Sequence, residues 1–170
     1  MINAKDMEQK FKAYELYSKS VSRDGVPYDL IVNTIPNLQE EVNDILDQIV
    51  DFNVIFNLDG KNVNAVIAYE DSKYWPIELV SGMEKFISSL AIRCALLNVS
   101  NLPRPTFIAI DEGFGVLDSD NINSLGHLFD YLKQKFEFVL IVSHIDTMKD
   151  MVDYSLDISK INGFSSINCQ

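Results

Sequence analysis

Apolar side chains near the amino terminus recur at intervals that place them on one face of a helix. They are Met7, Phe11, Tyr14 and Val21. Two heptads of this spacing fit both the end of a coiled coil and an amphipathic helix packed on the domain. Gly25 and Pro27 end the pattern, because neither residue continues a helix easily. The sequence therefore predicts a helix within residues 1–23 and a folded domain over residues 24–170.

The domain is predicted to open with a second helix and a hairpin. Proline is tolerated in the first turn of a helix, so we expect this helix to begin near Pro36 and to run to about Val50. Its apolar face consists of Leu38, Val42, Ile45 and Ile49. After it, β-prone runs at 54–56 and 63–69 flank the turn dipeptide Asp59–Gly60. This arrangement predicts an antiparallel hairpin.

Helical and strand patterns alternate over the rest of the chain. The main elements are helices at 86–97 and 122–136 and wholly apolar strands at 107–110 and 138–142. Apolar strands that alternate with helices are typical of a parallel sheet covered on both faces, so the predicted fold class is α/β. Three further elements are expected to close the domain: a short helix near 147–152 and edge strands near 156–159 and 165–167.

Composition and charge limit the function. The 170 residues include 47% hydrophobic side chains, enough for a core, and carry a net charge of −11. Residues 1–23 hold five basic and three acidic groups, which leaves nine basic against 22 acidic groups elsewhere. That surface matches a phosphate backbone poorly, so any DNA contact should lie mainly on another segment or chain.

Other sequence features predict a soluble intracellular protein. No apolar run approaches the roughly 18 residues that span a bilayer, and the amino terminus is polar rather than a signal sequence. Cys94 and Cys169 lie far apart and lack the spacing of a disulfide framework or of a zinc site built on cysteine. We therefore expect neither a membrane segment nor cysteine chemistry.

Polar residues follow both apolar strands. Asp111 and Glu112 end the first strand, at the position where α/β proteins bind ligands. There Asp111 is suited to hold Mg²⁺, usually through water, and Glu112 to orient and deprotonate an attacking water. His144 follows the second strand and is expected at the same edge, where it could contact a terminal phosphate. A solvated turn is the structural alternative for the acidic pair.

A helix start upstream has the composition of an anion site. Ser81 is followed three residues later by Glu84, the spacing of a capping box. At Ser81 and Gly82, a hydroxyl, free backbone N–H groups and the helix dipole together suit a γ-phosphate. Farther along, Asp118 is suited to cap the helix expected after the acidic pair.

Three segments, in this order, resemble the signature motif, the Walker B motif with its D-loop, and the His-switch of ABC-type ATPases. They are residues 79–86 (LVSGMEKF), 110–118 (IDEGFGVLD) and 142–145 (VSHI). The run DEGFGVLD is similar to the SMC and SbcC branch, which acts in DNA repair and chromosome maintenance, whereas transporters usually carry Asp-Glu-Pro. Residues 25–28 and 41–46 resemble the stretch after the returning coiled-coil arm. The resemblance implies the carboxy-terminal lobe of an ABC-type P-loop ATPase head, a mostly parallel sheet flanked by helices.

The resemblance also implies roles at an ATP-dependent dimer of two heads. Ser81 and Gly82, within the same motif as Glu84, would touch the γ-phosphate of ATP held by the opposing head. Met83 stands where the family usually has a second glycine.

In the second and third motifs, Asp111 would support Mg²⁺ and Glu112 would be the catalytic base. Asp118 would cross the dimer interface, and His144 would sense the γ-phosphate. These roles are implications of the resemblance alone.

No Gly-x-x-x-x-Gly-Lys-Ser/Thr loop, which grips phosphates in P-loop ATPases, occurs in the sequence. In the family this loop lies in an amino-terminal lobe, here called the Walker A lobe, beyond a long coiled coil. The resemblance therefore implies either a fragment of a longer protein or a head split between two chains, with ATP and Mg²⁺ bound only together with the Walker A lobe. It also implies DNA and a nuclease as partners, in a prokaryotic cytoplasm, a nucleus or a viral factory.

Two other interpretations stay open. A non-catalytic interaction or regulatory module with the same fold is favoured by Met83 and the missing phosphate loop. It is opposed by the retained polar residues Ser81, Asp111, Glu112 and His144. A transporter nucleotide-binding protein is the more distant alternative, because residues 112–114 and the absence of an identifiable membrane-coupling feature weaken it.

Overall fold

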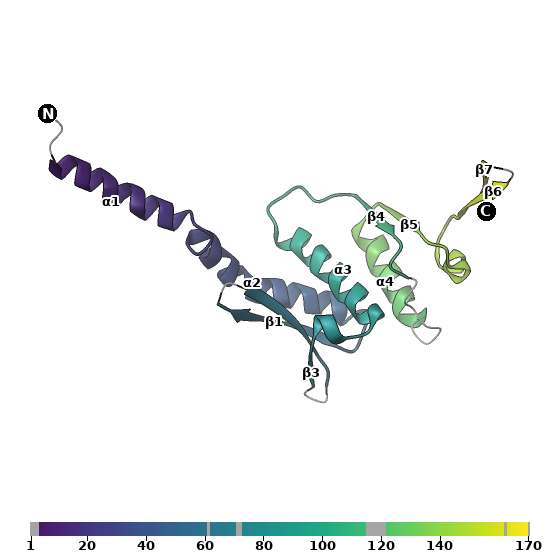
Figure 1. Cartoon of the computed structure of the whole chain (residues 1–170). Coiled ribbons are helices and arrows are strands. Elements are labelled where there is room, and N and C mark those ends of the chain that lie inside the picture. The colour runs from purple at the N-terminus through teal and green to yellow at the C-terminus, as the bar shows by residue number, and fades with distance from the viewer. Residues whose placement is uncertain (1–3, 61, 71–72, 115–121, 162, 170) are drawn as a thin grey trace.

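The computed structural model describes residues 4–60, 62–70, 73–114, 122–161 and 163–169 (Figure 1). The helices are α1 (Ala4–Ser20), α2 (Val26–Leu46), α3 (Gly82–Val99) and α4 (Ile122–Lys135), with the 3₁₀ helices η1 (Ile77–Leu79) and η4 (Asp146–Met151). The strands are β1 (Asn53–Asp59), β2 (Asn62–Ala68), β3 (Tyr74–Pro76), β4 (Phe107–Asp111), β5 (Phe138–Val142), β6 (Leu156–Ile161) and β7 (Phe164–Cys169).

Helix α1 projects away from the remaining elements (Figure 1). It has no buried residue, and its apolar side chains Met7, Phe11 and Tyr14 are all exposed. The alternative in which this helix packs on the domain is therefore wrong for the described residues. In addition, none of the described helices is both long and apolar enough to cross a lipid bilayer.

Helix α2 begins ten residues earlier than the sequence predicts. Pro27, not Pro36, occupies the first turn, and Pro36 lies inside the helix. An interior proline removes one backbone hydrogen bond, but Pro36 is exposed while Ile35 and Leu38 beside it are buried. Burial of the apolar face therefore maintains the helix through Pro36. The predicted face itself is confirmed, because Leu38, Val42, Ile45 and Ile49 are all buried.

The predicted hairpin is confirmed as β1 and β2, which pair antiparallel across the Asp59–Gly60 turn. The sequence analysis missed β3, which adds to β2 as a third antiparallel strand. Asn43 of α2 attaches this sheet to the helix: its amide oxygen accepts a hydrogen bond from the Val54 N–H at 2.8 Å, and its amide nitrogen donates to the Val54 carbonyl at 3.0 Å. The sheet and the helix thus form one body.

Strands β4 and β5 pair in parallel, as the alternation of strands and helices predicts. Ile110 on one face is buried in the core with Ile87 of α3 and Leu132 of α4. The opposite face carries Phe107, Ala109, Phe138, Leu140 and Val142, all exposed. We call these five residues the open sheet face. The expected covering on both faces is therefore absent from the described residues, because only the inner face meets helices.

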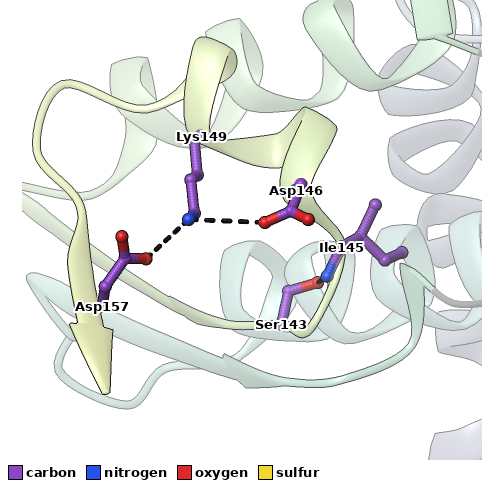
Figure 2. A network of polar contacts seen from close by, with 5 residues as sticks. All are labelled: Ser143, Ile145, Asp146, Lys149 and Asp157. Carbon is purple, nitrogen blue, oxygen red and sulfur yellow. Dashed lines mark hydrogen bonds and ion pairs between the residues drawn. The ribbon is translucent and has the colours of Figure 1, made fainter. Parts of the chain in front are cut away.

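The last two strands form a separate antiparallel hairpin. β6 and β7 pair with each other and not with β4 or β5, so the expectation that they close the domain as edge strands is wrong. The ammonium group of Lys149 in η4 contacts carboxylates of Asp146 at 3.3 Å and Asp157 of β6 at 2.7 Å (Figure 2). Hydrogen bonds to these two carboxylates raise the pKa of Lys149. These contacts connect the hairpin to η4.

Candidate functional site

The ends of β4 and β5 bring Glu112 and His144 together. The Glu112 N–H donates a hydrogen bond to the Val142 carbonyl at 2.9 Å, which continues the strand pairing by one residue beyond Asp111. Nδ1 of His144 lies 3.9 Å from Oε1 of Glu112, and both side chains are more than two-thirds exposed. An acid–base pair therefore stands open to solvent at the carboxyl edge of the parallel strands, where ligands bind in α/β folds.

Glu112 adopts an unusual backbone conformation. Its φ is +57°, the left-handed region, which costs about 1–2 kcal/mol for a residue with a Cβ atom. Gly113 follows with a φ of +104°. The two residues turn the chain sharply out of β4. Strained residues of this kind cluster at functional sites, so the conformation supports Glu112 as the centre of the site.

The turn after Glu112 packs against the helix that begins after Ser81. A Cβ atom added to Gly113 would lie 2.5 Å from a ring carbon of Phe86 in α3. The Phe86 ring also meets Phe114, with 4.9 Å between centroids, and Phe114 is fully buried. The position of Glu112 is therefore fixed against α3, and only glycine fits at residue 113.

Replacing Gly113 with alanine is expected to lower the free energy of unfolding by roughly 2 kcal/mol or more. The new methyl group would clash with Phe86 and would stand on a backbone conformation that alanine rarely adopts. Urea denaturation measures the effect. Gly126→Ala is the matched control: Gly126 lies in α4 with nothing within 4 Å of its added Cβ, so stability should stay equal or rise. Equal stability of Gly113→Ala and wild type would contradict this packing.

The loop that carries His144 is held by short-range contacts. The Ser143 hydroxyl accepts a hydrogen bond from the Ile145 N–H at 3.1 Å (Figure 2). Beyond Ile145, η4 is fixed by Lys149 through Asp146 and Asp157. The loop between β5 and η4 is thus supported on the side of His144 that continues into η4.

Ser81 caps α3, as the sequence predicts. The Ser81 hydroxyl accepts from the Glu84 N–H at 3.3 Å, and the Ser81 N–H donates to Oε2 of Glu84 at 2.8 Å, a complete capping box. Helix geometry leaves the N–H groups of Gly82 and Met83 without carbonyl partners in the helix. The Met83 side chain is buried in the core, so it leaves the exposed start of the helix accessible.

Sequence analysis missed Tyr69, which extends this cap. Its hydroxyl donates a 2.6 Å hydrogen bond to Oε1 of Glu84, so both carboxylate oxygens accept bonds within the chain. Although burial opposes it, hydrogen bonds from Tyr69 and Ser81 lower the pKa of Glu84. No sequence motif marks Tyr69, because the contact joins residues of two different elements. Glu84, predicted to belong to the nucleotide-binding motif, is engaged with Ser81 and Tyr69.

Alkaline pH is expected to weaken the contact of Tyr69 with Glu84. Burial and the Glu84 carboxylate raise the pKa of Tyr69 from 10.0 to about 12. Because the folded pKa exceeds the unfolded one, the stabilisation is complete below pH 10 and is lost as the pH rises from 10 to 12. Over this interval the free energy of unfolding should fall less steeply in Tyr69→Phe than in wild type, as measured by urea denaturation. Equal slopes would contradict the assignment.

The remaining predicted residues are Asp111 and Asp118. Asp111 is exposed at the end of β4, directly before Glu112. Among the residues that the structure covers, no three His, Cys, Asp or Glu side chains gather as a metal cluster. Mg²⁺ needs no such cluster, since one or two carboxylates, water and substrate phosphates are its usual ligands. Asp111 therefore fits Mg²⁺ together with a bound nucleotide. Asp118 lies outside the described residues.

Comparison with known proteins identifies the fold. An uncharacterized protein of Acanthamoeba polyphaga mimivirus is 33% identical over 180 residues, which cover 95% of this chain and 13% of that protein. The chromosome partition protein Smc of Fusobacterium nucleatum is 29% identical over 143 residues, covering 79% and 12%. The SbcC component of the SbcCD nuclease of Pseudomonas aeruginosa is 31% identical over 90 residues, covering 52% and 7%. No protein-family model matches the chain.

Solved structures give the same result. A structure described under ATP-driven dimerization and DNA-stimulated activation of SMC ATPases matches with a TM-score of 0.68 and 16% identity, over 84% of this chain and 89% of the other. The SMC head domain from Thermotoga maritima matches with a TM-score of 0.57 and 23% identity, over 84% and 50%. The chain is the carboxy-terminal lobe of an SMC/SbcC-like ATPase head. This head lobe spans 13% or less of the curated relatives named above.

Proposed function

We propose that this SMC/SbcC-like head lobe forms an ATP-hydrolysing site when it combines with a Walker A lobe and two such heads close on ATP. The observation that carries the proposal is the pairing of Glu112 and His144, 3.9 Å apart at the ends of two parallel strands. Glu112 would orient the attacking water and accept its proton, and His144 would hydrogen-bond the terminal phosphate. The fixed backbone around Glu112 supports the positioning that phosphoryl transfer requires.

Charge neutralisation at this site would come from other groups. Asp111, at the exposed end of β4, would hold Mg²⁺ through water, and bound Mg²⁺ supplies neutralisation of phosphate charge. Ser81, Gly82 and the start of α3 would contact the γ-phosphate of ATP on the opposing head, because a helix start with free N–H groups favours anions. Asp118 would cross the interface between the heads.

The open sheet face supports a partner lobe. Parallel sheets are normally covered on both faces, yet this face leaves Phe107 and Phe138 stacked in solvent with ring centroids 5.6 Å apart. A second layer of structure is needed to bury these side chains. We therefore infer that the Walker A lobe covers this face.

The assembled head would act in DNA repair, recombination or chromosome maintenance. This proposal rests on the similarity to Smc, SbcC and Rad50 proteins. The net charge of −11 and the acidic domain indicate that DNA contact lies mainly on other parts of the complex. A nuclease is the partner suggested by the similarity to SbcC of the SbcCD nuclease, and one solved SMC head was bound to the winged-helix domain of ScpA.

Reconstitution tests the proposal. The chain is combined with the Walker A lobe, and phosphate release from ATP is compared with that of each component alone. We expect hydrolysis only from the combination. A stable complex that binds ATP but never releases phosphate would refute the catalytic proposal and favour the non-catalytic module of the same fold.

A further inference from the structure

The phenol of Tyr69 is held in place independently of its hydrogen bond to Glu84. The Tyr69 N–H donates to the Lys73 carbonyl at 3.1 Å, between the ends of β2 and β3. Its ring lies beside Phe52, with 6.2 Å between centroids. Both contacts belong to the part of the chain that packs on α2, not to α3. Tyr69 therefore presents its hydroxyl to α3 from a separate, fixed support.

A single carboxylate links this support to the start of α3. Oε1 of Glu84 accepts from Tyr69 at 2.6 Å, and Oε2 accepts from the Ser81 N–H at 2.8 Å. Hydrogen bonds to an ionised carboxylate are about twice as strong as neutral ones. An ordinary capping box leaves one carboxylate oxygen to solvent, whereas here both oxygens are engaged.

The orientation of Glu84 matters because a carboxylate and a phosphate compete for the same groups. Both are stabilised by unpaired N–H groups at a helix start. The bond from Tyr69 keeps the Glu84 carboxylate on the Ser81 N–H. The N–H groups of Gly82 and Met83 then stay available to an anion.

From these contacts we propose that Tyr69 is a positioning residue for nucleotide binding at Ser81, acting through Glu84. This inference rests on the proposed function, since it assigns Ser81 to the γ-phosphate. Tyr69 does not touch the nucleotide. Its effect is to fix the cap that does.

The test uses Tyr69→Phe in the assembled head, meaning this chain combined with the Walker A lobe. Phenylalanine keeps the ring beside Phe52 and removes only the hydroxyl. We expect the ATP concentration for half-maximal hydrolysis to rise about 3- to 10-fold while kcat stays within about twofold, because binding and not the chemical step is affected. Hydrogen exchange at the Ser81 amide should also become faster.

Tyr28→Phe is the matched control. The Tyr28 hydroxyl donates to the Gly60 carbonyl at the tip of the hairpin, so the same atom is removed without touching α3. It should leave both kinetic parameters and the Ser81 amide exchange unchanged. In a Glu84→Ala background, Tyr69→Phe should have no further effect on the half-maximal ATP concentration.

The outcomes separate this inference from the proposed function. If wild-type head hydrolyses ATP and Tyr69→Phe matches Tyr28→Phe in every readout, the positioning role is overturned and the proposed function stands. An equal loss from Tyr69→Phe with and without Glu84 also overturns it. If the wild-type head hydrolyses no ATP, the proposed function fails, and with it the assignment of Ser81 to the γ-phosphate.

Discussion

Replacing Glu112 with glutamine is expected to lower ATP hydrolysis by the assembled head at least about 100-fold while ATP binding persists. Glutamine has the size of glutamate but cannot accept the proton of the attacking water. The main-chain bond from residue 112 to Val142 does not involve the side chain, so the turn should survive the change. Phosphate release measures turnover, and fluorescent nucleotide titration measures binding.

Glu137→Gln is the control for this change. Glu137 is exposed immediately before β5, at the opposite end of the same pair of strands from Glu112. The same loss of charge there should leave hydrolysis within about twofold of wild type, because the site lies at the carboxyl ends of the strands. If Glu112→Gln retained more than about a tenth of wild-type hydrolysis, Glu112 would not be the base.

Replacing Leu140 with aspartate is expected to weaken binding of the Walker A lobe by about 100-fold or more. Leu140 lies near the middle of the open sheet face and is 41% exposed without the partner. Burying an unpaired carboxylate against another lobe is costly, whereas the free chain keeps the new carboxylate in water. Titration calorimetry of the two lobes measures the binding.

Leu102→Asp is the control for the sheet-face prediction. Leu102 follows α3 and is 71% exposed, outside the open sheet face, so its replacement should leave lobe binding unchanged. The melting temperature of the chain alone should change little in either variant. Wild-type affinity in Leu140→Asp would exclude this face as the surface that the Walker A lobe covers.

Sequence pattern was sufficient for the local elements of the site. The capping box at Ser81 was visible because it depends on residues three apart. The parallel pairing of β4 with β5 followed from the alternation of apolar strands and helices, and it correctly placed Glu112 near His144. Both features depend on contacts whose partners follow from short-range pattern.

Other features depended on contacts that no local pattern encodes. Pro36 suggested a helix start, but tertiary burial of Ile35 and Leu38 outweighs the lost hydrogen bond. Tyr69 reaches Glu84 from another element, so its role required the fold. The wholly apolar strands correctly indicated two apolar faces in β4 and β5, but not that one face stays open in this chain.

The central claim is that one ATP is shared between Ser81 of one head and Glu112 of the other. Mixing two inactive assembled heads, Ser81→Arg and Glu112→Gln, tests it most directly. In a mixed dimer, one site would combine the intact Glu112 of the first head with the intact Ser81 of the second. The account predicts that the equimolar mixture recovers about a quarter of the wild-type rate of phosphate release, since half of the dimers are mixed and each has one intact site. No recovery, with mixed dimers present, would contradict it.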